Sequence, residues 1–297
     1  MLKQILLAFL LLISGGFILF VDIFDAIRPT ATFQASRPLF RGITYGRQVR
    51  NYPRPLVLHY VTVDLTDSDI QLITNPGVKQ GEKYQFAAQT TGDFAQEFNV
   101  QLAINAGFFY PIKYGTPWQF YPQKGDYVNV VGQAIAQGVE YEPAKPDWPA
   151  LCVGSQNDVS IEVTGECPKD TEVAIAGSLL LLDDGNAIAF DSDAPNNENV
   201  YPRIAVGLNR DRTQLWIVII DGRQPHYSEG VTLAEFSEIL SEFDINAAIN
   251  LDGGGSTTLV SGHTGKIQAL NSPIHSRIPM YQRPIATHFG IYAAPLD

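Results

Sequence analysis

The sequence predicts an α+β fold in which a mixed, largely antiparallel sheet packs against a few helices. Short apolar runs recur along the chain, and segments such as 215–220 and 247–251 have the length and composition of buried strands. The turn Asp183-Asp184-Gly185 lies between two further runs and is typical of an antiparallel hairpin. Few segments show helical spacing, so strands dominate the expected architecture.

The expected strands follow one another at 56–64, 70–74, 102–104, 179–182, 186–190, 215–220 and 247–251. A helix is expected over 86–98, because the aromatic residues of that segment show helical spacing. A second helix is expected from Thr232 to near Phe243, and Thr232 and Glu235 form a capping box at its start. The capping box gives Glu235 a structural role, so this glutamate is not a candidate for catalysis.

Two parts of the sequence resemble each other, which leads to the hypothesis of two pseudo-duplicated halves. Residues 97–107 can be laid over residues 242–252 with identical residue types at five positions. Downstream, a Tyr-x-Arg motif occurs twice before an apolar strand, ending at Arg203 and at Arg283. The hypothesis is that each half places an asparagine and an arginine near one shared site. The alternative is that helix–strand–turn units look alike by composition alone.

The composition is that of a globular protein, with 45% hydrophobic and 17% charged residues in a chain of 297. This length accommodates one large domain or two small ones. The net charge of −11 argues against nucleic acid as a partner, because no basic cluster is present to replace the condensed counterions. In so acidic a chain, an anionic substrate would need a local group of arginines inside a cleft.

The N-terminal segment 1–27 is predicted to be a secretory signal or an uncleaved membrane anchor. Its residues 5–21 are almost wholly apolar and follow a positively charged Lys3. The run falls slightly short of the roughly 20 apolar residues of a comfortable transmembrane helix. We expect an extracytoplasmic protein, periplasmic or at the cell surface, that contacts the membrane through this segment. Residues 28–55, which contain four prolines, are expected to form a spacer before a domain at 56–297.

The chain has two cysteines, Cys152 and Cys167, on either side of a strand-like segment. We expect them to form a disulfide in an exported protein, and closing this short loop would stabilise the fold by roughly 3 kcal/mol. The five histidines show no paired spacing, so no metal site and no cofactor are predicted, although aspartates could hold a divalent cation. The segment 111–150 shows no period and is expected to be an elaborated loop within an insertion at about 111–170.

Polar residues lie at the ends of three expected strands and are the richest chemical signal in the chain. Asp252 comes directly after the strand 247–251 and precedes three glycines, where no side chain obstructs the approach of another molecule. The motif is not a phosphate P-loop, because no lysine follows the glycines. The alternative is a tight loop between strands. The candidate residues are Asn105, Asp221, Arg223, Glu229, Asn250, Asp252, Gly253, Gly254, Gly255 and Ser256, together with Arg203 and Arg283 at the starts of two further strands.

These motifs resemble the phosphodiester glycosidase family in their order and approximate spacing. The resemblance covers about residues 56–293, and its most specific part is the aspartate–triglycine segment. One departure is Ala106, where the family usually has a second glycine. The segment 111–170 matches no family motif, so the identity of the sugar does not carry over. The matching motifs are Asn105–Phe109, Arg203–Gly207, Asp221–Arg223 with Ser228–Gly230, Asn250–Thr257 and Arg283–Gly290.

The resemblance implies hydrolysis of a sugar-1-phosphodiester at the anomeric carbon, on an envelope or extracellular glycan. The residue types suit that chemistry, because guanidinium groups bind phosphate and carboxylates support glycosidic cleavage. We predict Asp252, Asp221 and Glu229 as catalytic residues, although Asp221 in its Asp-Gly pair is also a common turn residue. The alternatives are a non-catalytic carbohydrate-binding protein of the same fold and a phosphodiesterase that cleaves the P–O bond. The predicted substrate-binding residues are Asn105, Arg203, Arg223, Asn250, Gly253, Gly254, Gly255, Ser256 and Arg283.

Overall fold

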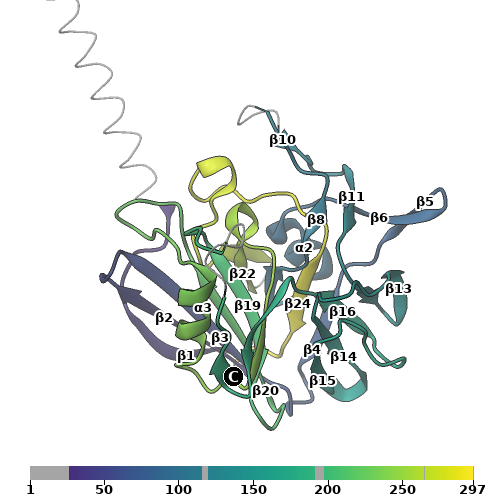
Figure 1. The fold of residues 1–297 in the computed structure, drawn as a ribbon, viewed down its shortest axis with the longest axis horizontal. Coiled ribbons are helices and arrows are strands. Elements are labelled where there is room, and N and C mark those ends of the chain that lie inside the picture. The colour runs from purple at the N-terminus through teal and green to yellow at the C-terminus, as the bar shows by residue number, and fades with distance from the viewer. Residues whose placement is uncertain (1–26, 116–119, 191–196, 264, 297) are drawn as a thin grey trace, which may run out of the picture.

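The computed structural model describes residues 27–115, 120–190, 197–263 and 265–296, which form a sheet-rich fold (Figure 1). Two antiparallel sheets share one large hydrophobic core between them, and a helix packs on the outer face of each. A third sheet also contributes side chains to that core. The predicted α+β class and the largely antiparallel pairing are confirmed, but the strands form several sheets rather than the single mixed sheet that was expected.

The larger main sheet has eight strands, and its order is β1 (Gln34–Phe40), β2 (Ile43–Arg50), β3 (Leu56–Asp64), β20 (Gln214–Ile220), β19 (Arg203–Leu208), β21 (Ala247–Asn250), β17 (Leu179–Asp183) and β18 (Asn186–Ala187). The second main sheet has five strands, in the order β23 (Lys266–Ala269), β22 (Leu259–His263), β7 (Leu102–Asn105), β24 (His288–Tyr292) and β4 (Gln71–Thr74). Neighbouring strands in both sheets run antiparallel.

The strand β20 shows why its sequence is apolar throughout. Leu215 and Ile219 point into the core between the two main sheets. Val218 and Ile220 pack on the opposite face, in the cluster formed with α3 (Leu233–Leu240). A strand that is buried on both faces loses the usual alternation of apolar and polar residues. Its predicted position in the middle of a sheet is confirmed, because β3 and β19 flank it.

The two helices α2 (Thr91–Phe98) and α3 lie on the outer faces of the five-stranded and eight-stranded sheets respectively. The predicted capping box at Thr232 is confirmed, but α3 ends at Leu240 rather than near Phe243. The helix predicted over 86–98 is only partly correct, because residues before 88 form a strand. In that strand Phe86 packs into a small core with side chains of neighbouring strands, and this tertiary contact overrides the local pattern.

Three smaller sheets complete the fold, and the predicted loop 111–150 supplies strands to all of them. These strands have two to four residues, too few to show a hydrophobic period. The first sheet contains β5 (Val78–Gln80), β6 (Lys83–Ala87), β11 (Tyr127–Val130) and β8 (Phe109–Tyr110), and the second contains β9 (Lys113–Tyr114) and β10 (Phe120–Tyr121). The third has the order β13 (Val139–Glu142), β12 (Ala134–Ala136), β16 (Val173–Ala176), β14 (Ala150–Val153) and β15 (Val159–Glu162).

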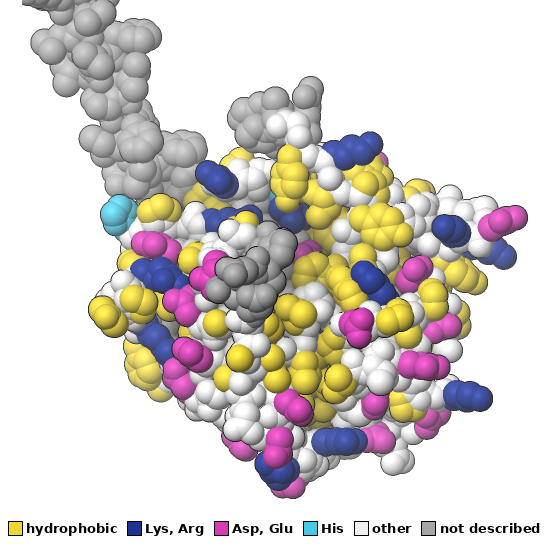
Figure 2. Space-filling model, viewed as in Figure 1, with side chains coloured by type: hydrophobic (Ala, Val, Ile, Leu, Met, Phe, Trp, Pro, Cys, Tyr) yellow, Lys and Arg dark blue, Asp and Glu magenta, His cyan; other side chains and the backbone are white. Residues whose placement is uncertain are grey.

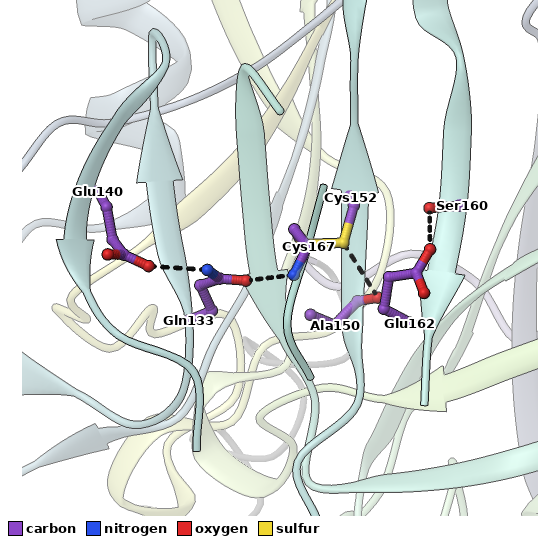
Figure 3. The surroundings of a disulfide bond; sticks show 7 residues. All are labelled: Gln133, Glu140, Ala150, Cys152, Ser160, Glu162 and Cys167. Carbon is purple, nitrogen blue, oxygen red and sulfur yellow. Dashed lines mark hydrogen bonds between the residues drawn. A yellow bond between two sulfur atoms is a disulfide. The ribbon is translucent and has the colours of Figure 1, made fainter. Parts of the chain in front are cut away.

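The predicted disulfide between Cys152 and Cys167 is confirmed (Figure 3). Cys152 lies in β14, and the two Cα atoms are 5.7 Å apart. The amide of Gln133 supports the bridge, because its oxygen accepts a hydrogen bond of 2.7 Å from the Cys167 backbone N–H, and its nitrogen donates to Glu140 at 2.7 Å. The bond therefore ties the segment after β15 to the middle of this sheet.

The predicted spacer at 28–55 is wrong, because β1 and β2 occupy most of it and form an edge of the eight-stranded sheet. The spacer was predicted from the four prolines of this segment, because proline disfavours the interior of a sheet. Pro38 lies in β1, an edge strand, where a missing N–H donor is tolerated. The strand β2 pairs with β3 along its whole length. The predicted signal or anchor at 1–27 lies almost wholly outside the described residues, among which no helix is long and apolar enough to cross a membrane.

Candidate active site

The triglycine turn after β21 is fixed by backbone contacts to two other segments. The N–H of Asp252 donates to the carbonyl of Ala106 at 3.1 Å, and the N–H of Gly254 donates to the carbonyl of Pro202 at 2.8 Å. The side-chain amide of Asn105, the last residue of β7, donates to the carbonyl of Asp252. The turn is thus mounted between the end of β7 and the residue before β19.

The glycines of this turn leave room for two arginines. Gly254 has a φ of +61°, which a side chain would strain. A Cβ at Gly255 would collide with the guanidinium group of Arg283, and a Cβ at Gly253 would lie 2.7 Å from the carbonyl oxygen of Pro202. Glycine is needed here because other parts of the same chain approach closely, whereas the sequence predicted the approach of another molecule.

Arg223 and Arg283 bring two guanidinium groups to the triglycine turn. Arg283 donates to the hydroxyl of Ser256 at 3.1 Å and to Nδ1 of His275 at 3.3 Å. Arg223 stacks on the ring of Tyr201, with its guanidinium carbon 4.3 Å from the ring centre. Neither arginine forms an ion pair with a carboxylate of the described residues. Two cations that form no ion pair are suited to an anionic ligand.

Asp252 carries a carboxylate that lies within the influence of both arginines. Its Oδ2 atom is buried and has no hydrogen-bond partner among the described residues, although the residue as a whole is partly exposed. Burial raises the pKa of Asp252 to about 6, against the opposing effects of Arg283, Ser256 and Arg223. A carboxyl group with this pKa exists in both protonation states near neutral pH, which suits proton transfer or charge stabilisation.

A cleft with a volume of about 390 Å³ is lined by Arg223 and Arg283, whereas Asp252 and the triglycine residues lie behind these arginines and do not line it. Burial lowers the pKa of His275 to about 4, and the Arg283 cation acts in the same direction, so this histidine is neutral and accepts from Arg283. The sequence prediction missed His275 and the aromatic residues of the cleft, although Tyr201 stands in the repeated Tyr-x-Arg motif. The cleft is lined by Tyr114, Gly115, Phe120, Tyr201, Arg223, Ser276, Arg277 and Arg283.

Arg203 is buried at the start of β19 and does not line the cleft. Its side chain donates to the backbone carbonyls of Val231 and Asn199, at 3.2 Å and 2.9 Å. Burial lowers the pKa of Arg203 to about 10, and Arg223 contributes in the same direction. Arg203 therefore holds the segments on either side of it, and the structure favours a positioning role over the predicted contact with substrate.

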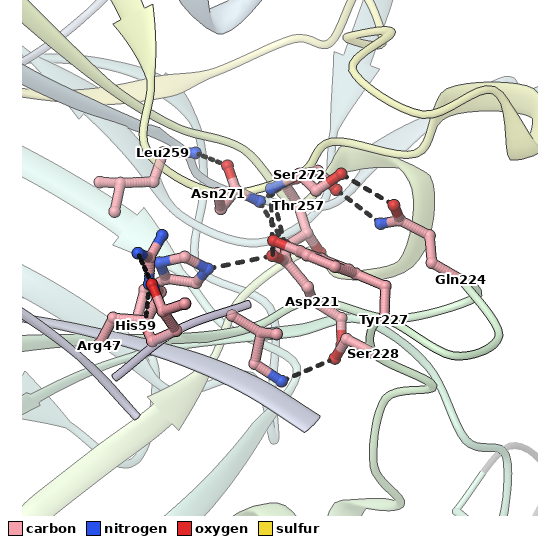
Figure 4. A network of polar contacts seen from close by, with 12 residues as sticks. Arg47, His59, Asp221, Gln224, Tyr227, Ser228, Thr257, Leu259, Asn271 and Ser272 are labelled. Carbon is pink, nitrogen blue, oxygen red and sulfur yellow. Dashed lines mark hydrogen bonds and ion pairs between the residues drawn. The ribbon is translucent and has the colours of Figure 1, made fainter. Parts of the chain in front are cut away.

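Asp221 is not accessible to a substrate, which corrects its prediction as a catalytic residue (Figure 4). Its carboxylate accepts hydrogen bonds of 3.0 Å from the Asn271 amide and from the Ser272 backbone N–H, and lies 3.0 Å from Nε2 of His59. Tyr227 adds a longer bond of 3.4 Å. Every one of these partners is buried, so Asp221 joins the end of β20 to the segment after β23.

The remaining predicted residues do not meet in the cleft. Glu229 is exposed, and its carboxylate contacts no described residue through a hydrogen bond or ion pair. Asn105 is fully buried and uses both ends of its amide on the loop after β21, since its oxygen also accepts from the Thr258 backbone N–H at 2.9 Å. Asn250 donates to Ser178 at 2.9 Å, and its buried oxygen has no partner among the described residues. Both asparagines are placed to hold strands rather than sugars.

The charged side chains of the described residues form no metal-binding group, and on the face shown in Figure 2 they form no large basic surface. No group of three or more His, Cys, Asp or Glu side chains in this part of the chain is arranged to hold a metal ion. On the face shown in Figure 2, acidic and basic side chains are interspersed and neither sign dominates. Arg223 and Arg283, together with Arg277, therefore form a local group of cations at the cleft.

Comparison with known proteins identifies one matching family. A model of the family described as phosphodiester glycosidase matches residues 98–292. No curated protein matches the sequence. Among solved structures, a hypothetical protein from Synechocystis has a similar fold, with a TM-score of 0.63 and 15% identity over 87% of this chain. The present chain spans 64% of the length of that protein.

Two further solved structures have similar folds. One is the catalytic domain of zebrafish N-acetylglucosamine-1-phosphodiester alpha-N-acetylglucosaminidase, auto-inhibited by its pro-peptide, with a TM-score of 0.58, 17% identity and coverage of 91% of this chain and 92% of that one. The other is a protein described as exported, from Burkholderia pseudomallei, with a TM-score of 0.55, 14% identity and coverage of 82% and 75%. At these identities the likeness shows the fold alone.

Proposed function

The chain belongs to the phosphodiester glycosidase family, and we propose that it is an exported hydrolase that cleaves a sugar-1-phosphodiester at the anomeric carbon. The observation that carries the proposal is the unpartnered carboxylate oxygen of Asp252 beside two guanidinium groups without carboxylate partners. The apolar segment 5–21 and the disulfide support an extracytoplasmic location. Envelope or extracellular glycans are the substrates we propose for such a location.

Arg223 and Arg283 are proposed to bind the phosphate of the substrate. A phosphodiester carries one negative charge, and a guanidinium group can donate two parallel hydrogen bonds to its oxygens. In this structure Arg283 donates hydrogen bonds to Ser256 and His275, which are both neutral groups. A phosphate would compete well for these donors, because hydrogen bonds between charged groups are the stronger ones. Drawing Arg283 off the triglycine turn would also uncover Asp252.

Asp252 is proposed to act as an ionised carboxylate at the anomeric carbon. Glycosidases usually need a second carboxyl group that protonates the leaving oxygen. A phosphodiester leaving group is already acidic, so it departs with little proton donation, and a single carboxylate suffices. The negative charge of Asp252 would support the oxocarbenium-like transition state or activate the attacking water. Asp221 contributes indirectly in this scheme, because its buried hydrogen bonds fix the loop that carries Arg223.

Hydrolysis in ¹⁸O-labelled water tests the proposal against both alternatives. UDP-N-acetylglucosamine and other sugar-1-phosphodiesters are screened as substrates, and the products are analysed by mass spectrometry. We expect the label in the sugar hydroxyl, since attack at the anomeric carbon breaks the C–O bond. Label in the phosphate would instead identify a phosphodiesterase that cleaves the P–O bond. Binding of these compounds without turnover would identify a carbohydrate-binding protein.

A further inference from the structure

A second cavity, of about 550 Å³, lies between residues 27–30, the hairpin of β1 and β2, and β23. We propose that this cavity is a binding site for a phosphate group, separate from the cleft and independent of the proposed hydrolysis. Three arginines, Arg28, Arg37 and Arg47, line it together with Tyr45. The chain has only 20 Lys and Arg residues and a net charge of −11, so three cations around one cavity are a marked local excess.

Arg47 and Arg37 have donors available for an anion. Arg47 is buried, with 8% of its surface exposed, and it donates from Nε and Nη2 to the carbonyl and hydroxyl of Thr32, at 2.8 Å and 3.3 Å. Two bonds leave three of its five N–H groups for a ligand. Arg37 is exposed, and its side chain forms no hydrogen bond or ion pair with the described residues. A buried guanidinium next to open space is a stronger anion site than a surface cation, because water screens it less.

The buried carboxylate of Asp221, which is linked to Tyr45 of the cavity wall through His59, is engaged by other polar groups. The hydroxyl of Tyr45 lies 2.9 Å from Nδ1 of His59. The Nε2 atom of His59 lies 3.0 Å from the Asp221 carboxylate, as Figure 4 shows. Asp221 also accepts bonds from Asn271 and Ser272. The Asp221 carboxylate therefore interacts with His59, Asn271 and Ser272. It forms no ion pair with the arginines that line the cavity. Arg37 and Arg47 form no ion pair with a carboxylate of the described residues, so their positive charges are available to a ligand.

The shared chemistry of the ligand is a phosphate group, which could come from two sources. The cavity begins at residue 27, and the apolar segment 5–21 precedes it closely in the sequence. A phospholipid headgroup would be within reach if that segment is a membrane anchor. A soluble phosphate compound could enter the same cavity, which is open to solvent.

Calorimetric titration of the full chain with inorganic phosphate tests the site. The double variant Arg223→Ala/Arg283→Ala removes the guanidinium groups of the cleft, and we expect it to bind phosphate at one remaining site. Adding Arg37→Ala should weaken that binding about tenfold or more, the effect of one hydrogen bond between charged groups. Adding Arg41→Ala is the matched control, because Arg41 lies in the same hairpin but pairs with Asp67 and Asp69 instead. It should leave the affinity unchanged.

Two results would overturn the proposal. One is the loss of all phosphate binding in the cleft double variant, and the other is an equal weakening by Arg37→Ala and Arg41→Ala, which would reflect overall charge only. The source is resolved with monomeric short-chain phosphatidylglycerol, using phosphatidylcholine of the same chain length as the control. Tighter binding of phosphatidylglycerol than of phosphate, lost in Arg37→Ala, supports a lipid headgroup. Equal binding of phosphatidylglycerol and phosphate, again weakened by Arg37→Ala, supports a soluble ligand.

Discussion

The strands β7 and β21 have the same surroundings and different endings. Each follows a helix that starts at a capping box, lies between two antiparallel neighbours and ends in an asparagine. The neighbours of β7 are β22 and β24, and those of β21 are β17 and β19. In each sheet a Tyr-x-Arg motif lies at or before one neighbour, because Arg203 is the first residue of β19 and Arg283 precedes β24. This parallel is what the duplication hypothesis would require, but the hypothesis itself stays a prediction until residues 97–107 and 242–252 are superposed.

The residues that follow the two strands differ in charge and in the contacts they make at the site. After Asn250 the chain continues to Asp252 and the triglycine turn, which carries the free carboxylate oxygen. After Asn105 it carries no charged group, but the Asn105 amide holds Asp252 and Thr258 in place. In the proposed mechanism, one strand end supplies the reactive group and the other holds that group in place. The predictions below separate these two roles, starting with the largest effect.

Replacing Asp252 by Asn should lower kcat by several orders of magnitude and leave the fold nearly intact. The substitution keeps size and hydrogen-bonding capacity but removes the charge that matters most in the transition state, so kcat carries the loss and substrate binding changes little. Steady-state kinetics on a sugar-1-phosphodiester, together with thermal unfolding, measure both quantities. Asp244→Asn, on the exposed loop before β21, is the matched control and should have wild-type activity.

Two outcomes would break this assignment. A stable and fully active Asp252→Asn protein would mean that the end of β21 carries no chemistry. Early unfolding of the variant would mean that Asp252 only fixes the turn, and the reading of these glycines as a plain loop would hold.

The raised pKa of Asp252 predicts that activity and stability change in opposite directions with pH. The pKa lies at about 6 in the folded protein, above its ordinary value of 3.8, so the folded state binds this proton more tightly than the unfolded state does. The free energy of unfolding should therefore fall as the pH is raised from 4 to 6, by up to about 3 kcal/mol. Over the same range kcat/KM should rise as the carboxylate ionises. Urea unfolding and kinetics at each pH measure these trends, and Asp252→Asn should remove the fall in stability.

The sequence could reveal elements whose signal is local. The apolar strand β20, the capping box at Thr232 and the pair Cys152–Cys167 are all confirmed, because each depends on residues close together in the chain. The aspartate–triglycine run also predicted a turn, because three consecutive glycines favour a tight turn or a close approach of the backbone. The structure shows a tight turn at these glycines, and Arg283 packs closely against it.

Other features depend on contacts between distant segments and left no local trace. The sequence around Asp221 is compatible with a turn residue or a catalytic residue. Its structural role depends on hydrogen bonds from Asn271 and Ser272, about fifty positions later in the chain. The hairpin of β1 and β2 was hidden by prolines that an edge strand tolerates. His275 gave no sequence signal, because its role depends on the approach of Arg283.

Replacing Arg223 or Arg283 by Ala should cost roughly 1.5–3 kcal/mol in kcat/KM, the range for a hydrogen bond to a charged group. The loss should be larger for a phosphodiester substrate than for a neutral aryl glycoside of the same sugar. Arg203→Ala should instead lower stability and affect both substrates alike, because Arg203 holds backbone carbonyls. Equal losses on both substrates for all three variants would show that the cleft arginines are structural too.

The smallest expected effect is the difference in stability between the variants Asn105→Ala and Asn250→Ala. Asn105→Ala leaves two buried backbone groups without partners, so it should lower the free energy of unfolding by about 2 kcal/mol. Asn250→Ala loses one bond to Ser178 but also removes a buried oxygen that has no partner, so its cost should be about 1 kcal/mol less. Urea unfolding of both proteins measures the difference.

The same two variants also test the division of roles between the strand ends. Asn105→Ala should lower kcat as well as stability, because Asp252 then loses the amide that holds its carbonyl. Asn250→Ala should retain more of its activity, because the Asn250 side chain contacts Ser178 rather than the turn. If the two variants lose stability and activity equally, the two strand ends contribute alike. The contrast between a reactive end and a mounting end would then fail, while the proposed duplication would gain support.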